Sequence, residues 1–161
     1  MEAILLIGIQ ASGKSTFYKE KFFNTHIRIS NDLFKTKNRE KLLLQFCRET
    51  NMPFVIDNTN VTKTMREKYI RFAKEINIPI TGYYFKTNIK RSLEWNKNRT
   101  GKECIPNVGI FAALKRLEPP SIDEGFTNLF CVDIINNTFI VTTNDLTKTS
   151  TMCNSNKKCE E

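Results

Sequence analysis

The chain has 161 residues, 40% of them apolar, and a formal net charge of +8, which argues against two separate cores and favours a polyanionic partner such as nucleic acid or nucleotide phosphates. Its five widely spaced cysteines contain no C-x-x-C pair, which speaks against a disulfide framework or a zinc site and fits a reducing compartment. The apolar start is too short to span a bilayer, so we expect no targeting segment, no membrane partner and a cytoplasmic location.

Short apolar runs alternate with longer segments of helical period, the pattern of strand-helix repeats around a parallel sheet. In chain order, strands are predicted at 3–9, 26–30, 54–57, 80–85 and 128–135, and helices at 14–23, 31–49, 62–77, 88–98 and 107–117. The later run TFIVTT could add an edge strand. Residues 144–161 are rich in polar residues and are predicted to form a disordered tail.

The first predicted strand leads into LLIGIQASGKSTF, which contains the pattern G-x-x-x-x-G-K-S between a strand and a helix. Glycines let successive backbone N–H groups turn toward phosphate oxygens, and the helix adds the positive end of its dipole. Lys14 is expected to bridge the β and γ phosphates, and the Ser15 hydroxyl to coordinate Mg²⁺. The alternative is a glycine turn capped by Ser12. The predicted nucleotide contacts are Gly8, Gln10, Ala11, Ser12, Gly13, Lys14, Ser15 and Thr16.

Two carboxylates follow predicted strands, at the edge where such sheets bind ligands. Asp32 stands in ISNDLFK and could accept the proton of a hydroxyl that attacks the γ phosphate. Its alternative role is helix capping, together with Ser30 and Asn31. Asp57 ends FVID and is similar to the carboxylate that holds Mg²⁺ through water, or it forms an Asp-Asn turn.

The segment 86–102 carries six cations against the single acid Glu94. Its end, NRTGKECIP, is not helical in pattern, and a basic loop with a glycine could close over the transferring phosphate. We expect Arg99 to reach that phosphate, and most of the lysines to form a solvated helix face.

Taken together, these residues resemble the 5′-kinase domain of polynucleotide kinases, over about residues 3 to 135. The resemblance is carried by GIQASGKST, ISNDLFK, VIDNTNVTKTMREKYIRFAKE, the NR of the basic loop and LKRLEPPSIDEGF. It implies that Lys14 and Ser15 hold the triphosphate and metal, that Asp32 is the base for the 5′ hydroxyl, and that Arg99 is the lid arginine. The implied substrate contacts are Asp32, Lys35, Asp57, Asn58, Thr59 and Asn60, with Ser15 and Asp57 at the metal.

The chain departs from the family pattern at two positions. Lys35 replaces an arginine that contacts the acceptor end, and a lysine is a point charge rather than a planar fork. Trp95 replaces a second lid arginine, and the lid spacing to Pro106 is one residue longer. These departures leave open how the protein would hold the 5′ end of the acceptor.

The sequence therefore predicts an α/β fold, a three-layer sandwich of the P-loop type with a mainly parallel five-stranded sheet and a small basic lid. Residues 1–135 are expected to form a kinase domain that uses ATP and Mg²⁺ to phosphorylate 5′-hydroxyl ends of DNA or RNA, and 136–161 a polar extension. A kinase of a small molecule or nucleotide sugar and a non-catalytic nucleotide-binding module remain alternatives. The residues given leave no room for a phosphatase or ligase module, so we expect 3′ processing to come from another protein. DNA against RNA, ATP against GTP and the oligomeric state stay open.

Overall fold

The computed structural model describes residues 1–101 and 104–143. Two residues of the predicted basic loop, 102 and 103, and the predicted tail 144–161 lie outside the described residues. Within the described part of the chain, no helix is both long and apolar enough to cross a membrane.

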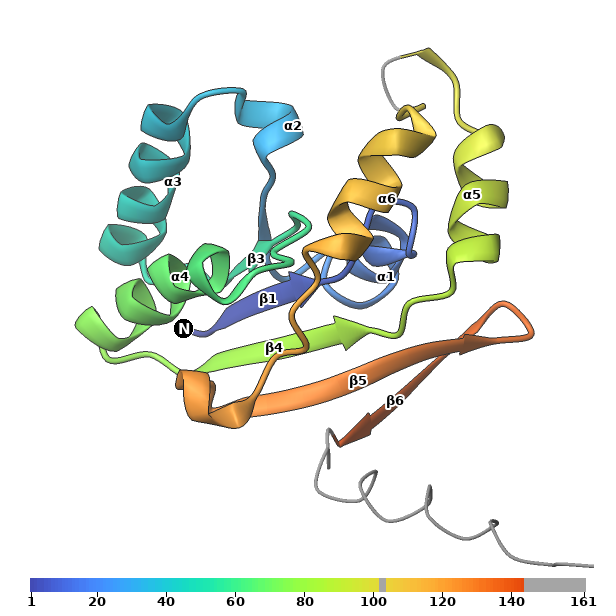
Figure 1. Ribbon diagram of the computed structural model, residues 1–161. Coiled ribbons are helices and arrows are strands. Elements are labelled where there is room, and N and C mark those ends of the chain that lie inside the picture. The colour runs from blue at the N-terminus through green and yellow to red at the C-terminus, as the bar shows by residue number, and fades with distance from the viewer. Residues whose placement is uncertain (102–103, 144–161) are drawn as a thin grey trace, which may run out of the picture.

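A six-stranded sheet in the order β2-β3-β1-β4-β5-β6 forms the centre of the molecule (Figure 1). The first five strands pair in parallel, and β6 pairs antiparallel to β5. The mainly parallel α/β fold is confirmed, and the sixth strand is the TFIVTT run that the sequence left as a possible edge. The strands are β1 (Ala3–Ile7), β2 (Ile27–Ile29), β3 (Phe54–Ile56), β4 (Ile80–Phe85), β5 (Asn128–Ile135) and β6 (Thr138–Thr143).

A tight turn joins the last two strands. Asn136 and Asn137 have φ angles of 49° and 60°, the left-handed conformation that a two-residue hairpin turn requires and that Asn tolerates. The turn allows the chain to reverse and add β6, which explains why the sheet is larger than the predicted five strands.

Helices cover both faces of this sheet and make three layers. Alternate residues of β1 point to opposite faces, as the period of a strand dictates. Ala3, Leu5 and Ile7 pack with the side chains of α3 and α4, whereas Ile4 and Leu6 pack with those of α1. A third apolar cluster lies beneath α5 and α6. The helices are α1 (Lys14–Lys21), α2 (Asn31–Phe34), α3 (Lys37–Thr50), α4 (Lys63–Glu75), α5 (Ile89–Lys97) and α6 (Asn107–Lys115), with a 3₁₀ turn η2 (Ile122–Glu124).

The helix predicted over 31–49 is two helices in the structure, so this prediction is corrected. Lys35 ends α2 in the left-handed conformation, with φ 58°, and Thr36 caps α3 by accepting a hydrogen bond from the N–H of Arg39. No glycine marks this break, and a lysine in that conformation is uncommon. The break gives Asp32 a short helix of its own.

Candidate active site

The loop between β1 and α1 has the curled backbone that the motif predicted. Ala11 and Gly13 have positive φ angles of 53° and 95°, so neighbouring N–H groups can converge on an anion. Gly13 is the N-cap residue of α1 and no side chain caps that helix, so the alternative in which Ser12 is the cap is not what the structure shows. The positive φ favours glycine at this position, and a Cβ at Gly13 would also lie 2.9 Å from the Cδ1 atom at the end of the Ile134 side chain, which would have to shift.

Lys14 is buried over this loop. Its Nζ donates hydrogen bonds to the carbonyl oxygens of Gly8 and Ile9, at 3.0 and 2.5 Å, and to the Ser12 Oγ at 3.3 Å. Burial lowers the pKa of Lys14 to about 8; the Asp57 carboxylate acts against this shift and the Arg99 guanidinium adds to it. The ammonium group is therefore held by its own loop, at the place where the motif expects phosphate oxygens.

One cavity gathers most of the predicted catalytic groups from four parts of the chain. Lys14 comes from the first turn of α1, Asp32 from α2, Asp57 from the position after β3 and Arg99 from the segment after α5, and all four line the cavity. The remaining lining residues are Gln10, Ala11, Ser12, Gly13, Ser15, Asn58, Thr59 and Ile105. The buried side-chain oxygen of Gln10 accepts no hydrogen bond from the described residues.

The two residues predicted to hold the metal touch each other. The Ser15 Oγ donates a hydrogen bond of 2.8 Å to the Asp57 Oδ2. A hydroxyl and a carboxylate are hard oxygen ligands, and Mg²⁺ commonly takes one or two such groups together with substrate phosphates and water, so this pair fits the ion. Among the described residues, no three His, Cys, Asp or Glu side chains gather as a metal site, which leaves the remaining ligands to phosphate and water.

Arg28 contacts both Ser15 and Asp57, and the sequence did not predict this contact. Its Nε and Nη2 lie 2.8 and 2.6 Å from the same Asp57 Oδ2, and its Nη2 lies 3.2 Å from the Ser15 Oγ. Arg28 and Asp57 are brought together because β2 and β3 are adjacent and parallel. A single basic residue in a short strand gives no local signal of this contact.

Asp32 is exposed in the first turn of α2, and its carboxylate does not cap that helix. Ser30 is the N-cap residue and makes no side-chain capping bond. Asn58 holds the helix instead: its Oδ1 accepts a hydrogen bond of 2.8 Å from the N–H of Asn31, and its Nδ2 donates to the Tyr69 hydroxyl at 3.2 Å. Asn58, predicted as a substrate contact, therefore anchors the helix that carries Asp32.

The other predicted residues differ in their distance from the cavity. Thr59 lines it and accepts the N–H of Gly8 through its carbonyl oxygen, at 2.9 Å. Asn60 is buried, and its Nδ2 donates a hydrogen bond of 2.7 Å to the carbonyl oxygen of Leu6. Thr16 and Lys35 are exposed and are not among the residues that line the described cavities. Their predicted roles stay predictions.

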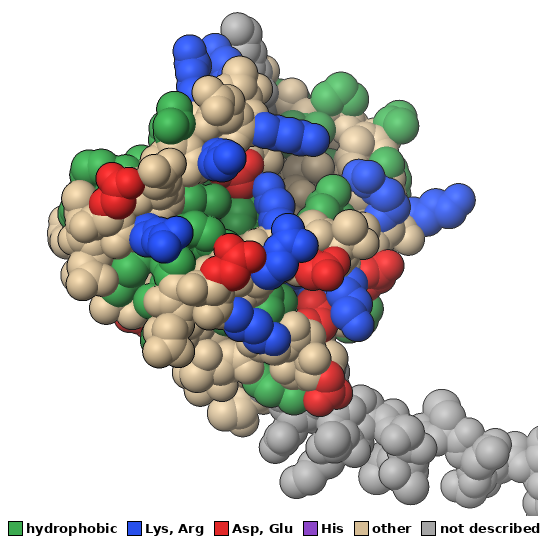
Figure 2. All heavy atoms as spheres, turned by 90° about the vertical axis from the view of Figure 1, so that its left-hand side faces the viewer, with side chains coloured by type: hydrophobic (Ala, Val, Ile, Leu, Met, Phe, Trp, Pro, Cys, Tyr) green, Lys and Arg blue, Asp and Glu red, His purple; other side chains and the backbone are tan. Residues whose placement is uncertain are grey.

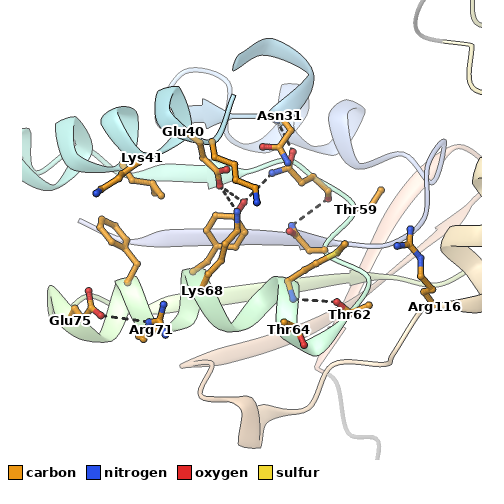
Figure 3. A pocket seen from close by; sticks show the side chains of 17 residues that line it. Asn31, Glu40, Lys41, Thr59, Thr62, Thr64, Lys68, Arg71, Glu75 and Arg116 are labelled. Carbon is orange, nitrogen blue, oxygen red and sulfur yellow. Dashed lines mark hydrogen bonds and ion pairs between the residues drawn. The ribbon is translucent and has the colours of Figure 1, made fainter. Parts of the chain in front are cut away.

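A wide groove of about 810 Å³ lies between α3 and α4 and shares Asn58 and Thr59 with the first cavity. On this side of the molecule, exposed apolar side chains lie among lysine and arginine side chains, with several acidic side chains between them (Figure 2). In Figure 3, residues of α3 and of α4 form the two walls, with Thr59 and Arg116 at one end. The cations of the lining are Lys37, Lys41, Lys68, Arg71 and Arg116, and its acids are Glu40 and Glu75.

The acid Glu40 in this groove is neutralised by its own neighbours. The Lys68 Nζ lies 2.9 Å from its Oε1, and the Tyr69 hydroxyl donates a hydrogen bond to the same oxygen. Burial and the contact with Glu40 raise the pKa of Tyr69. Glu40 and Lys68 therefore largely cancel each other's charge, and Glu75 lies 3.8 Å from Arg71. The other cations of the groove are Lys37, Lys41 and Arg116, and its apolar side chains include Leu44, Met65 and Phe72.

Known proteins resemble this chain in sequence and in fold. A family model described as an AAA domain matches residues 4–120. The "Bifunctional polynucleotide phosphatase/kinase" of Schizosaccharomyces pombe is 28% identical over 137 residues, which cover 80% of this chain and 32% of that protein. The chain thus spans about a third of the length of this curated relative.

Two solved structures share the fold at low sequence identity. A gluconokinase from Sinorhizobium meliloti is 19% identical with a TM-score of 0.55, over 82% of each chain. Kti12 from Chaetomium thermophilum, in complex with ADP-AlF3, is 16% identical with a TM-score of 0.62, over 81% of this chain and 88% of that one. Since the family model covers most of its length, the chain belongs to this AAA domain family, and it shares its fold with these two structures.

Proposed function

We propose that the protein transfers the γ phosphate of ATP to the 5′-hydroxyl end of DNA or RNA. The observation that carries the proposal is that Lys14, Asp32 and Arg99 line one cavity at the carboxyl ends of the strands. Phosphoryl transfer depends on positioning and charge neutralisation, and these three residues supply a base and two cations around the place of a triphosphate.

In the proposed reaction, the oxygen of the 5′ hydroxyl attacks the γ phosphorus and the bond from that phosphorus to the β–γ bridging oxygen breaks. The Asp32 carboxylate takes the hydroxyl proton, and ADP is the leaving group. Lys14 and Arg99 balance negative charge on the transferring phosphate. Ser15 and Asp57 would hold Mg²⁺, which neutralises the phosphate oxygens when it is bound.

The groove between α3 and α4 supports a polymer rather than a small molecule as the acceptor. It meets the first cavity at Asn58 and Thr59, so a strand whose end lies at Asp32 could continue between the two helices. Cations along a groove hold a phosphate backbone, and apolar side chains offer surface to bases. The named activity of the fission yeast relative supports the same acceptor.

The direct test uses γ-labelled ATP, Mg²⁺ and DNA and RNA oligonucleotides of one sequence that end in a 5′ hydroxyl or a 5′ phosphate. We expect label only on hydroxyl ends. In Asp32→Asn, transfer should fall by about 100-fold or more while ATP affinity changes little, because a general base acts on the acceptor alone. Asp133→Asn removes a carboxylate of β5 that pairs with Lys86 and is the control. Equal transfer by both variants would contradict the role of Asp32, and ATP binding without label on any end would favour a small-molecule acceptor.

A further inference from the structure

The positive charge closest to the proposed metal ligands belongs to Arg28. Its side chain is 27% exposed, whereas the Asp57 side chain is 2% exposed, so the guanidinium lies between the buried carboxylate and solvent. Ser15 and Arg28 together direct three donors at the single Asp57 Oδ2 atom. A carboxylate oxygen has about two lone-pair sites, so these donors leave none free on Oδ2, and a metal ion that binds this atom must displace at least one of them.

We propose that Arg28 is a built-in cation that occupies the Ser15–Asp57 pair until a nucleotide arrives, so that divalent metal binds only together with the nucleotide. The inference rests on the metal pair of the proposed function and adds a residue that controls when that pair is available. It predicts an order of events: free metal is excluded, and the metal–nucleotide complex displaces the guanidinium.

Electrostatics supports this exclusion. A buried carboxylate without a partner is costly, and Arg28 removes that cost in the absence of ligand. A divalent ion on the same oxygen would stand close to the guanidinium, and like charges at such a distance repel strongly in a partly buried site. One cation can therefore occupy the pair at a time. A triphosphate changes the balance because its negative charges favour the metal and attract the arginine as well.

Arg28 also lies against an aromatic ring while it contacts Asp57. Its guanidinium carbon lies 5.6 Å from the centre of the Tyr18 ring, within the range of a cation–π contact. A side chain that leaves Asp57 can keep this contact. The displacement therefore costs less than exposure of the arginine to water alone.

The test measures binding of Mn²⁺ alone to the nucleotide-free protein, with free ion detected by electron paramagnetic resonance. We expect weak binding by the wild type and at least about tenfold tighter binding by Arg28→Met, since the repelling charge is gone. Arg28→Lys keeps the charge and should bind as weakly as the wild type. Adding Asp57→Asn to Arg28→Met should abolish the gain, and thermal melting verifies that each variant is folded. Unchanged affinity in Arg28→Met, or a gain that survives Asp57→Asn, overturns the proposal.

Nucleotide binding gives a second readout that does not need an acceptor. In the wild type, Mn²⁺ should tighten ATP binding strongly, and by linkage ATP should tighten Mn²⁺ binding by the same factor. The factor by which Mn²⁺ and ATP tighten each other's binding should be smaller in Arg28→Met than in the wild type. An equal factor in both proteins would contradict the proposed role of Arg28. If Asp57→Asn leaves the factor of the wild type intact, the metal pair itself is wrong and the inference fails with it. A missing transfer to oligonucleotides, with these binding results as expected, overturns only the proposed function.

Discussion

At the scale of residues, Lys14 must be charged to hold a triphosphate, yet it is buried. Burial lowers its pKa to about 8, so the neutral form grows as the pH rises through this value. Below pH 8 the ammonium is present, and ATP affinity should be nearly constant. Above it, binding must first add a proton to the lysine, so affinity should fall by up to about tenfold for each further pH unit. Calorimetric titration with ATP between pH 7.5 and 9.5 measures this dependence.

The comparison variant for this pH series is Lys14→Met. It should bind ATP weakly, and its affinity should not change over the same pH range, because the titrating group is absent. The range begins above the second ionisation of a phosphate, so the nucleotide does not change its own charge. Wild-type affinity that stays constant up to pH 9.5 would mean that Lys14 remains fully charged in the free protein.

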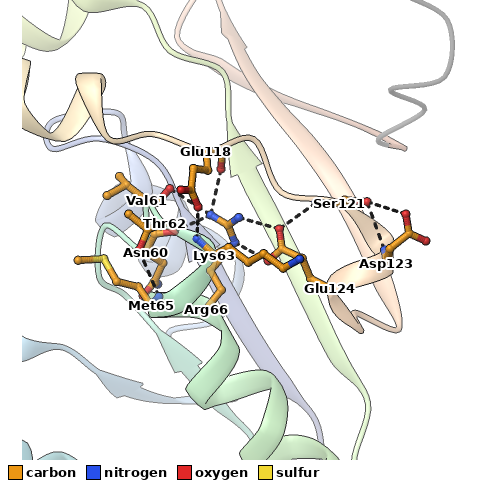
Figure 4. Close-up of polar contacts among 10 residues, drawn as sticks. All are labelled: Asn60, Val61, Thr62, Lys63, Met65, Arg66, Glu118, Ser121, Asp123 and Glu124. Atoms are coloured by element: carbon orange, nitrogen blue, oxygen red, sulfur yellow. Dashed lines mark hydrogen bonds and ion pairs between the residues drawn. The ribbon is translucent and has the colours of Figure 1, made fainter.

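At the scale of elements, Arg66 joins α4 to two connecting segments (Figure 4). It has 0% exposure, and its Nε and Nη2 donate to the two carboxylate oxygens of Glu124 at 2.7 and 2.6 Å. Its Nη1 donates to the carbonyl oxygens of Asn60, Val61 and Glu118. The arginine therefore fixes the connection after β3, which carries Asn58 and Thr59, against the segment that follows α6.

The Glu124→Gln variant keeps the shape of this side chain and removes its charge. It leaves a buried guanidinium without a counter-charge, so we expect the free energy of unfolding to fall by about 3 kcal/mol or more. Urea denaturation monitored by circular dichroism measures the change. Glu67→Gln, at an exposed position on α4 next to Arg66, should change stability by about 0.5 kcal/mol or less. A loss below about 1 kcal/mol in Glu124→Gln would show that the pair is not a main support of the fold.

Local sequence patterns predicted some parts of the fold and of the candidate site but not others. The strand, loop and helix around Lys14 were predictable because glycine spacing and hydrophobic periodicity act over a few residues. Asp32 and Asp57 could be placed in one site because the carboxyl ends of parallel strands share an edge of the sheet. The contacts of Arg28 with Asp57 and of Arg66 with Glu124 could not be predicted from local patterns. They join residues 29 and 58 positions apart in the sequence and depend on which elements become neighbours in the fold.

At the scale of the whole molecule, the groove joins the candidate catalytic cavity to the surface between α3 and α4. A positive net charge spread evenly over a protein would attract any polyanion, but a groove that leads to Asp32 should guide a strand toward its end. Lys37 and Lys41 line the groove and lie one helical turn apart on α3. If the groove holds the acceptor, these two lysines should matter more than equal charges elsewhere.

The double variant Lys37→Glu, Lys41→Glu tests this idea with little danger of unfolding, because acids near the amino end of α3 interact favourably with its dipole. We expect the KM for a 5′-hydroxyl oligonucleotide to rise by about tenfold at low salt. Each lost phosphate contact should also lessen the dependence of log KM on log salt by about 0.7, so the two lysines together change the slope by about 1.4. The KM for ATP should stay constant, since neither residue lines the nucleotide cavity.

The matched variant Lys19→Glu, Lys21→Glu makes the same charge change on α1, and neither lysine lines the groove. Its oligonucleotide KM and salt slope should remain close to those of the wild type, because neither lysine lies along the proposed path of the strand. Steady-state kinetics at several salt concentrations compare the two variants. If both raise KM equally, the acceptor responds to net charge alone, and the strand does not lie between α3 and α4.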